Sequence, residues 1–164
     1  MQTTDISDSL TTLLSELIDG AKAGGAYVLN SGDVGLLRSL DKLSATDASQ
    51  SLAGGATIAA HAEHLRFGLS LMNHWAREGG NPFADAAWDK AWQTTVVDDA
   101  EWTRIRKGLR DEATGWLRAV GSLRNVNAVE LNGVIGSIVH LGYHLGAMRQ
   151  IAAGARGPRE GTFS

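Results

Sequence analysis

The sequence predicts an all-α protein in which four long helices form a bundle and short extra helices join them. Three observations support this prediction. Apolar residues recur at spacings of three and four along four long segments, as on one face of an α-helix. Capping residues precede several of these segments, and no two segments resemble paired strands. At 164 residues the chain has the size of one ordinary domain, so residues 1–164 are expected to form a single unit.

The first long helix is predicted over residues 6–22. Asp5 or Ser7 can cap its beginning, and Gly24-Gly25 can end it. Its apolar face consists of Leu10, Leu13, Leu14, Leu17 and Ile18.

A connection of short elements follows. Residues 26–33 are expected to form a loop, because their brief apolar run has no partner strand. A short helix is predicted over residues 34–43, and Ser44 with Asp47 resembles the capping box of one further turn. The inner side of the short helix is expected to carry Leu36, Leu37, Leu40 and Leu43.

The second long helix is predicted from Ile58 to about Glu78, with Thr57 as its cap and a Gly-Gly-Asn-Pro break after it. At 100° per residue, His61 falls inside the apolar arc and His64 near its edge, so both are expected to be at least partly buried. His74 falls on the polar arc and is expected to be exposed.

The second half of the chain supplies two more long helices. Residues 83–95 are predicted to form a short helix with Trp88 and Trp92 on one face. Capping boxes at residues 98–101 and 127–130 open long helices that run to about Val120 and through Ile151. The tail, residues 154–164, is expected to be flexible.

Composition excludes several classes of function. The net charge of -3 and the lack of a basic stripe argue against a nucleic-acid partner. No apolar stretch is long enough to span a membrane, and the N-terminus lacks a signal-peptide pattern, so a cytoplasmic location is expected. The chain has no cysteine, which excludes thiolate ligands and a cysteine nucleophile. Any bound metal must be held by nitrogen and oxygen.

His140 and His144 are the first candidate metal ligands. Residues four apart share a helix face, so one ion can bind both imidazoles if a third ligand comes from elsewhere. The alternative is that both histidines are packed and bonded to carbonyls or water. Glycines at positions 133, 136, 142 and 146 weaken the helix, a cost usually tolerated where another helix approaches closely.

Two motifs together resemble the DinB-like/YfiT-like superfamily. They are the run from Thr57 to Leu65, which contains His61 and His64, and the run from His140 to Gln150. The spacing of the tryptophans between these runs is also similar. The resemblance implies an up-down-down-up four-helix bundle that holds one divalent metal, and it implies a homodimer.

The resemblance implies His64, His140 and His144 as the ligands, because the family's first ligand lies six residues after the start of the second helix. The helical wheel alone slightly favours His61. His61 therefore stays open as an alternative ligand, a second-shell group or a core histidine. Three imidazole ligands without a carboxylate argue against magnesium and calcium as the bound metal. Zinc or nickel is the metal expected first, and iron or manganese comes next.

Trp75 and Arg149 are candidates for contact with a small-molecule substrate or cofactor. Trp75 lies on the same side of its helix as His64, although tryptophans more often pack in a core or a dimer interface. Arg149 can pair with an anionic substrate group or stabilise the C-terminal end of its helix.

The resemblance implies a metal-dependent S-transferase or isomerase that uses a low-molecular-weight thiol such as bacillithiol or mycothiol. Two alternatives stay open. One is hydrolysis by a metal-bound water, and the other is a non-catalytic metal-binding dimer that acts as a sensor or stress protein. No residue can be assigned as a general acid or base from the sequence.

Overall fold

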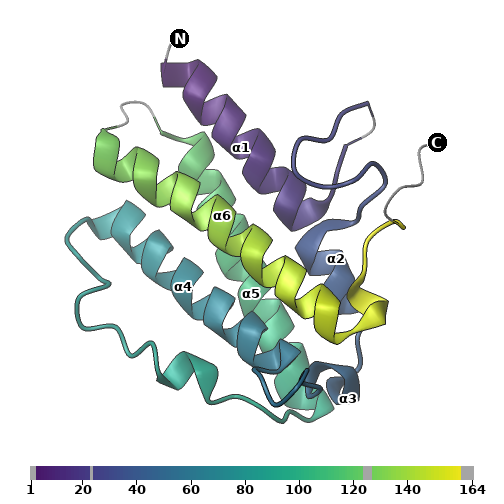
Figure 1. Ribbon diagram of the computed structural model, residues 1–164. Coiled ribbons are helices and arrows are strands. Elements are labelled where there is room, and N and C mark those ends of the chain that lie inside the picture. Colours follow the sequence, from purple (N-terminus) through teal and green to yellow (C-terminus); the bar gives the residue numbers. More distant parts are fainter. Residues whose placement is uncertain (1–2, 23, 124–126, 160–164) are drawn as a thin grey trace.

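The computed structural model describes residues 3–22, 24–123 and 127–159, and within these ranges the chain is all-helical with no β-strand. Four of its helices are long and the rest are short (Figure 1). The elements in chain order are α1 (Thr3–Asp19), α2 (Gly35–Asp41), α3 (Ala45–Ala48), α4 (Ile58–Glu78), the 3-10 helix η1 (Lys90–Trp92), α5 (Asp99–Gly121), α6 (Ala128–Ile151) and the 3-10 helix η2 (Ala153–Ala155).

The four long helices pack side by side. Both α1 and α4 lie against α5 and α6, so each long helix has two long neighbours. Figure 1 shows that α1 and α6 begin at the end of the molecule where α4 and α5 finish. The neighbouring pair α4 and α6 is therefore antiparallel, which brings the first turns of α4 beside the last turns of α6.

One apolar core joins all the long helices and α2. Burial of these side chains is the main force that holds the helices together. Its largest fully buried members include Leu14, Leu17, Ile18, Leu36, Leu40, Ile58, Trp102, Ile105, Leu109, Leu141 and Met148. Trp102 and Trp116 belong to the core, and each indole N–H finds an acceptor, in the Leu43 carbonyl and the Ser137 hydroxyl respectively.

Several predicted helix ends are confirmed. Thr57 caps α4 by accepting from the Ala60 amide, and α4 has the predicted bounds. Two of the predicted capping boxes form with both of their hydrogen bonds. One lies at α3, between Ser44 and Asp47, and the other at α6, between Asn127 and Glu130. At α5 only half of the box forms: Asp98 accepts from the Glu101 amide, but the Glu101 carboxylate binds Arg104 instead.

The predicted bounds of the first helix are wrong at both ends. Asp5 and Ser7 lie inside α1 instead of capping it, and the helix ends before Gly20, earlier than the predicted Gly24-Gly25 stop. Gly20 has a φ of +100°, and a side chain there would collide with the Asp33 carbonyl. The close return of the chain at Asp33 therefore sets the end of α1.

Two other expectations need correction. Residues 83–95 contain turns and the single 3-10 turn η1, not a helix with an aromatic face. The beginning of the predicted flexible tail packs on the protein, because Ala155 is 1% exposed and the Arg156 Nε donates to the Arg149 carbonyl. Residues 160–164 of that tail lie outside the described ranges.

No helix in the part of the chain that the structure covers is both long and apolar enough to cross a membrane.

Candidate metal centre

Four histidines meet where α4 and α6 cross at one end of the molecule. His61 and His64 lie in the first two turns of α4, and His140 and His144 lie on adjacent turns of α6. The Nε2 atoms of His64 and His140 are 3.0 Å apart, and the Nδ1 atoms of His61 and His144 are 2.8 Å apart. The antiparallel packing of the two helices thus pairs His61 and His64 of α4 with His144 and His140 of α6, respectively.

Three of these side chains can share one ion. One ring nitrogen from each of His64, His140 and His144 lies within 4.8 Å of the other two. Within the described ranges, no other group of three or more histidines, aspartates or glutamates is placed to do so. The structure therefore brings together the three ligands implied by the family resemblance.

His61 lies beside this group and not in it. Its Nδ1 hydrogen-bonds the Nδ1 of His144, and the two ring centroids are 5.0 Å apart. This contact occupies one nitrogen of His144 and leaves the other to face a ligand. This contact fits two of the roles considered for His61: a group that orients the His144 ring, as partners of metal-binding histidines do, or a further ligand beside His144.

Burial keeps the histidines neutral. His64 and His144 are buried, at 7% and 3% exposure. Loss of solvation, together with the neighbouring histidines, lowers the pKa of His64 to about 4 and that of His144 to about 3. Burial also lowers the pKa of His61 and that of His140, whose ring is partly desolvated although the residue is exposed overall. Neutral imidazoles offer the free lone pair that a metal requires.

The donor set fits a divalent transition metal. Zn–N bonds of about 2.0–2.1 Å in a tetrahedral site place two ligand nitrogens about 3.3 Å apart. The separation of 3.0 Å between His64 and His140 needs only a small adjustment to match. The other ring nitrogen of His64, Nδ1, is buried and has no hydrogen-bond partner among the described residues; it points away from Nε2, so an ion bound at Nε2 would not complete it.

Aromatic rings that sequence reasoning did not assign to the centre cover the histidines. Trp92 stacks on His64 with ring centroids 4.2 Å apart. It also lies edge-on to His61 and tilted against His144. Trp88 lies 5.6 Å from His64, and Tyr143 lies edge-on to His144. The predicted helix with Trp88 and Trp92 on one face does not form: Trp88 lies in a turn and Trp92 in the 3-10 helix η1.

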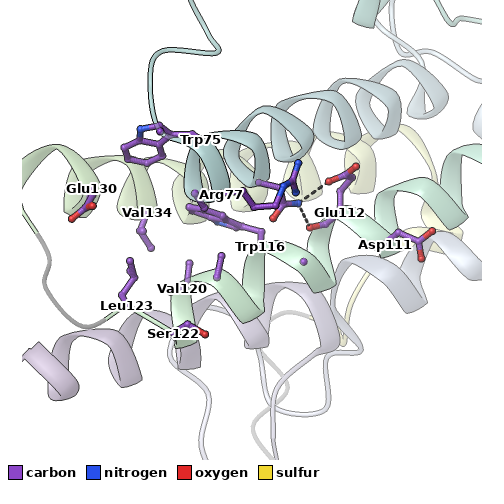
Figure 2. A pocket seen from close by; sticks show the side chains of 15 residues that line it. Trp75, Arg77, Asp111, Glu112, Trp116, Val120, Ser122, Leu123, Glu130 and Val134 are labelled. Carbon is purple, nitrogen blue, oxygen red and sulfur yellow. Dashed lines mark hydrogen bonds between the residues drawn. The ribbon is translucent and has the colours of Figure 1, made fainter.

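Two cavities border α4 and α6, and the smaller one adjoins the histidines. It has a volume of about 290 Å³, and His140 forms part of its wall. The larger, of about 740 Å³, lies between the other end of α4 and α5 and contains none of the histidines (Figure 2). In its wall Asn73 donates to the Glu112 carboxylate. The chemistry of the histidine cluster, and not cavity size, identifies the functional site.

The structure places the remaining candidates away from the histidines. Trp75 lines the larger cavity and its ring lies against Gly133. The anionic partner of Arg149 is the chain's own Asp33, with Nη2 and Oδ1 2.7 Å apart, and neither alternative predicted for Arg149 anticipated this bond. His74, predicted to be exposed, is partly exposed, and its ring lies 3.4 Å from Glu78.

The glycines of α6 have different roles. Gly133 allows close packing as predicted, because a Cβ there would lie 2.8 Å from the Trp75 ring. A Cβ on Gly142 would make ordinary contact with Leu17 of α1. At Gly136 and Gly146 a Cβ would meet nothing within 4 Å, so no neighbouring helix requires glycine there.

Comparisons of the chain with protein-family models, curated proteins and solved structures gave no significant match.

Proposed function

We propose that the protein is a metal-dependent enzyme whose centre is one divalent transition metal, zinc or nickel first and iron or manganese next, held by His64, His140 and His144. The convergence of three neutral imidazoles from two helices is the observation that carries this proposal. Three nitrogen ligands leave at least one position for water or substrate, as in catalytic sites and unlike closed structural sites.

We further propose that the fold is the DinB-like/YfiT-like bundle. The support is the order and direction of the four long helices, together with ligands on the second and fourth of them. This proposal brings the candidate reaction that the family resemblance implies, the transfer of a low-molecular-weight thiol. Since the chain has no cysteine, the thiol would come from a small molecule.

In that reaction the sulfur forms a bond to an electrophilic carbon, the leaving group departs with its electron pair, and the thiol proton passes to solvent. A bound divalent metal would lower the pKa of a coordinated thiol. The protein's own contribution is to hold the three imidazoles, to cover one side with Trp92, and to leave the exposed side of His140 open to small molecules.

The reaction is tested by incubating the zinc-loaded protein with bacillithiol, mycothiol or a simpler thiol and a chlorinated electrophile. Formation of the thioether and release of chloride should exceed the rate given by the His144→Ala variant. Tight zinc binding without turnover for any thiol would contradict the transferase and favour the non-catalytic metal-binding protein. Hydrolysis of an ester by the zinc-loaded protein alone would favour the hydrolase.

We also propose that the protein is a homodimer that associates through α6. Residues 131–148 contain no aspartate, glutamate, lysine or arginine. Ile135, Val139 and Tyr143 are nonetheless 44%, 66% and 69% exposed along one face of this helix. An uncharged, apolar helix face of this kind is typical of an interaction surface.

A further inference from the structure

The cavity of about 290 Å³ beside the histidines is lined mainly by apolar residues. It lies between α4 and α6, and Phe83 and Trp88 from the segment after α4 close one side. Its apolar wall consists of Leu65, Leu69, Met72, Phe83, Trp88 and Leu141.

No charged side chain lines this cavity. Of its polar residues, Ser137 already accepts from the Trp116 indole and donates to the Val134 carbonyl. The other two, Asn132 and His140, are exposed residues that follow one row of α6 along the cavity's rim. A charged ligand would lose its hydration inside this space and gain no counter-charge.

Glycine keeps the cavity open. Gly136 is the residue between Asn132 and His140 in the same row of α6, and a Cβ there would meet nothing within 4 Å. A glycine inside a helix costs up to about 1 kcal/mol relative to alanine. Since no neighbouring group fills the space at Gly136, the effect of this glycine is to leave room next to the histidines.

From the lining, the volume and the position of His140, we propose that this cavity binds the uncharged, apolar part of a small substrate, an aromatic ring or a branched alkyl group. The volume is near the lower end of the range for small-molecule sites. The proposal rests on the proposed function in one respect: His140 is both a wall of the cavity and a metal ligand, so a group bound here would carry its reactive atom to the metal.

Binding can be measured on the metal-free protein, by saturation-transfer NMR and calorimetry with toluene and naphthalene. Benzoate and benzylammonium serve as charged counterparts of similar size. We expect the two hydrocarbons to bind about ten-fold or more tightly than the charged compounds, because burial of an unpaired charge is unfavourable. Equal affinities for charged and uncharged compounds, or no binding of either hydrocarbon, would overturn the proposal.

Gly136→Leu places a side chain in the cavity and should abolish binding of the hydrocarbons. Gly146→Leu is the matched control, because Gly146 is also an exposed glycine of α6 with open space at its Cβ but does not line this cavity. Both changes favour the helix, so circular dichroism should show intact folds. If Gly136→Leu leaves hydrocarbon binding unchanged, the hydrocarbons bind elsewhere and the proposal is wrong.

Zinc titrations separate this proposal from the proposed function. Gly136→Leu should bind zinc like the unmodified protein while losing toluene, and His64→Ala should bind toluene while losing zinc. If the unmodified protein binds toluene but not zinc, the metal enzyme alone is contradicted. If the unmodified protein binds zinc but not toluene, the apolar subsite alone is contradicted.

Discussion

At the level of single residues, burial determines the charge state of the histidine cluster. His64 and His144 are held neutral because the fold removes water from them, and the neighbouring imidazoles add to this effect. An isolated histidine begins to protonate near pH 6.5, where a proton competes with a metal for its lone pair. These two side chains avoid that competition well below neutral pH.

The same pKa shifts predict acid sensitivity of the metal-free protein. Unfolded histidines take up protons near pH 6.5, but His64 and His144 do so in the folded state only at about 4 and about 3. Between these values the unfolded state binds more protons, so the free energy of unfolding should fall as pH falls below about 6.5. Urea denaturation between about pH 7.5 and pH 4.5 measures this dependence.

The control for this prediction is His144→Ala, which removes one of the two groups. Its free energy of unfolding should change less steeply over the same pH range, whatever its absolute value. An unchanged slope would show that His144 is not held neutral by the fold.

His61 is predicted to orient His144 without binding the metal. His61→Ala should weaken zinc binding about 10- to 100-fold, as is usual when a partner of a ligating histidine is lost. His64→Ala should remove high-affinity binding altogether. Calorimetric zinc titration of the two variants compares their losses of affinity. A larger loss in His61→Ala than in His64→Ala would make His61 the ligand, as the helical wheel alone favoured.

At the level of elements, the predictions that succeeded rest on local signals. Thr57 and the Asn127–Glu130 capping box define the starts of α4 and α6 through bonds within one turn. These two helices carry all four site histidines, so their correct bounds were enough to place His140 and His144 on one face. Choosing between His61 and His64 needed the family resemblance, because both lie on buried turns of α4.

The predictions that failed depend on contacts between distant segments. Gly20 ends α1 because Asp33 returns against it, and nothing near Gly20 in the sequence records that contact. Trp92 covers the histidines from the 3-10 helix η1, whereas its four-residue spacing from Trp88 predicted one longer helix. The bond between Arg149 and Asp33 likewise joins residues far apart in the sequence.

That bond predicts a structural role for Arg149. Asp33 is 3% exposed, so removing the guanidinium with Arg149→Met leaves a buried carboxylate poorly compensated. The expected loss is about 3–5 kcal/mol of unfolding free energy. Lys107→Met is the control, because the Lys107–Asp111 pair is well exposed and should contribute less than about 1 kcal/mol. If urea denaturation shows an equally small loss of unfolding free energy in Arg149→Met and Lys107→Met, the structural role of Arg149 is contradicted.

The proposed dimer predicts that charge on the outer face of α6 separates the chains. Val139→Glu should convert a dimer into a monomer in sedimentation velocity, because Val139 is 66% exposed in the middle of the uncharged face. Val96→Glu, at a site that is 80% exposed and outside α6, should leave the dimer intact. A monomeric unmodified protein, or a dimeric Val139→Glu variant, would contradict the proposal.

For the whole molecule, the metal centre joins two helices that are far apart in the sequence. His64 comes from α4, and His140 and His144 come from α6, so a bound ion would link the middle of the chain to its last long helix. An ion that binds only the folded state stabilises it by mass action. Function and stability are therefore expected to depend on the same three side chains.

The most direct test of the central claim is a calorimetric zinc titration of the metal-free protein and its histidine variants. The unmodified protein and His74→Ala, which changes a partly exposed histidine outside the cluster, should each bind about one zinc ion per chain. His64→Ala, His140→Ala and His144→Ala should each lose high-affinity binding. Full affinity retained by His64→Ala and His140→Ala would contradict the three-histidine centre.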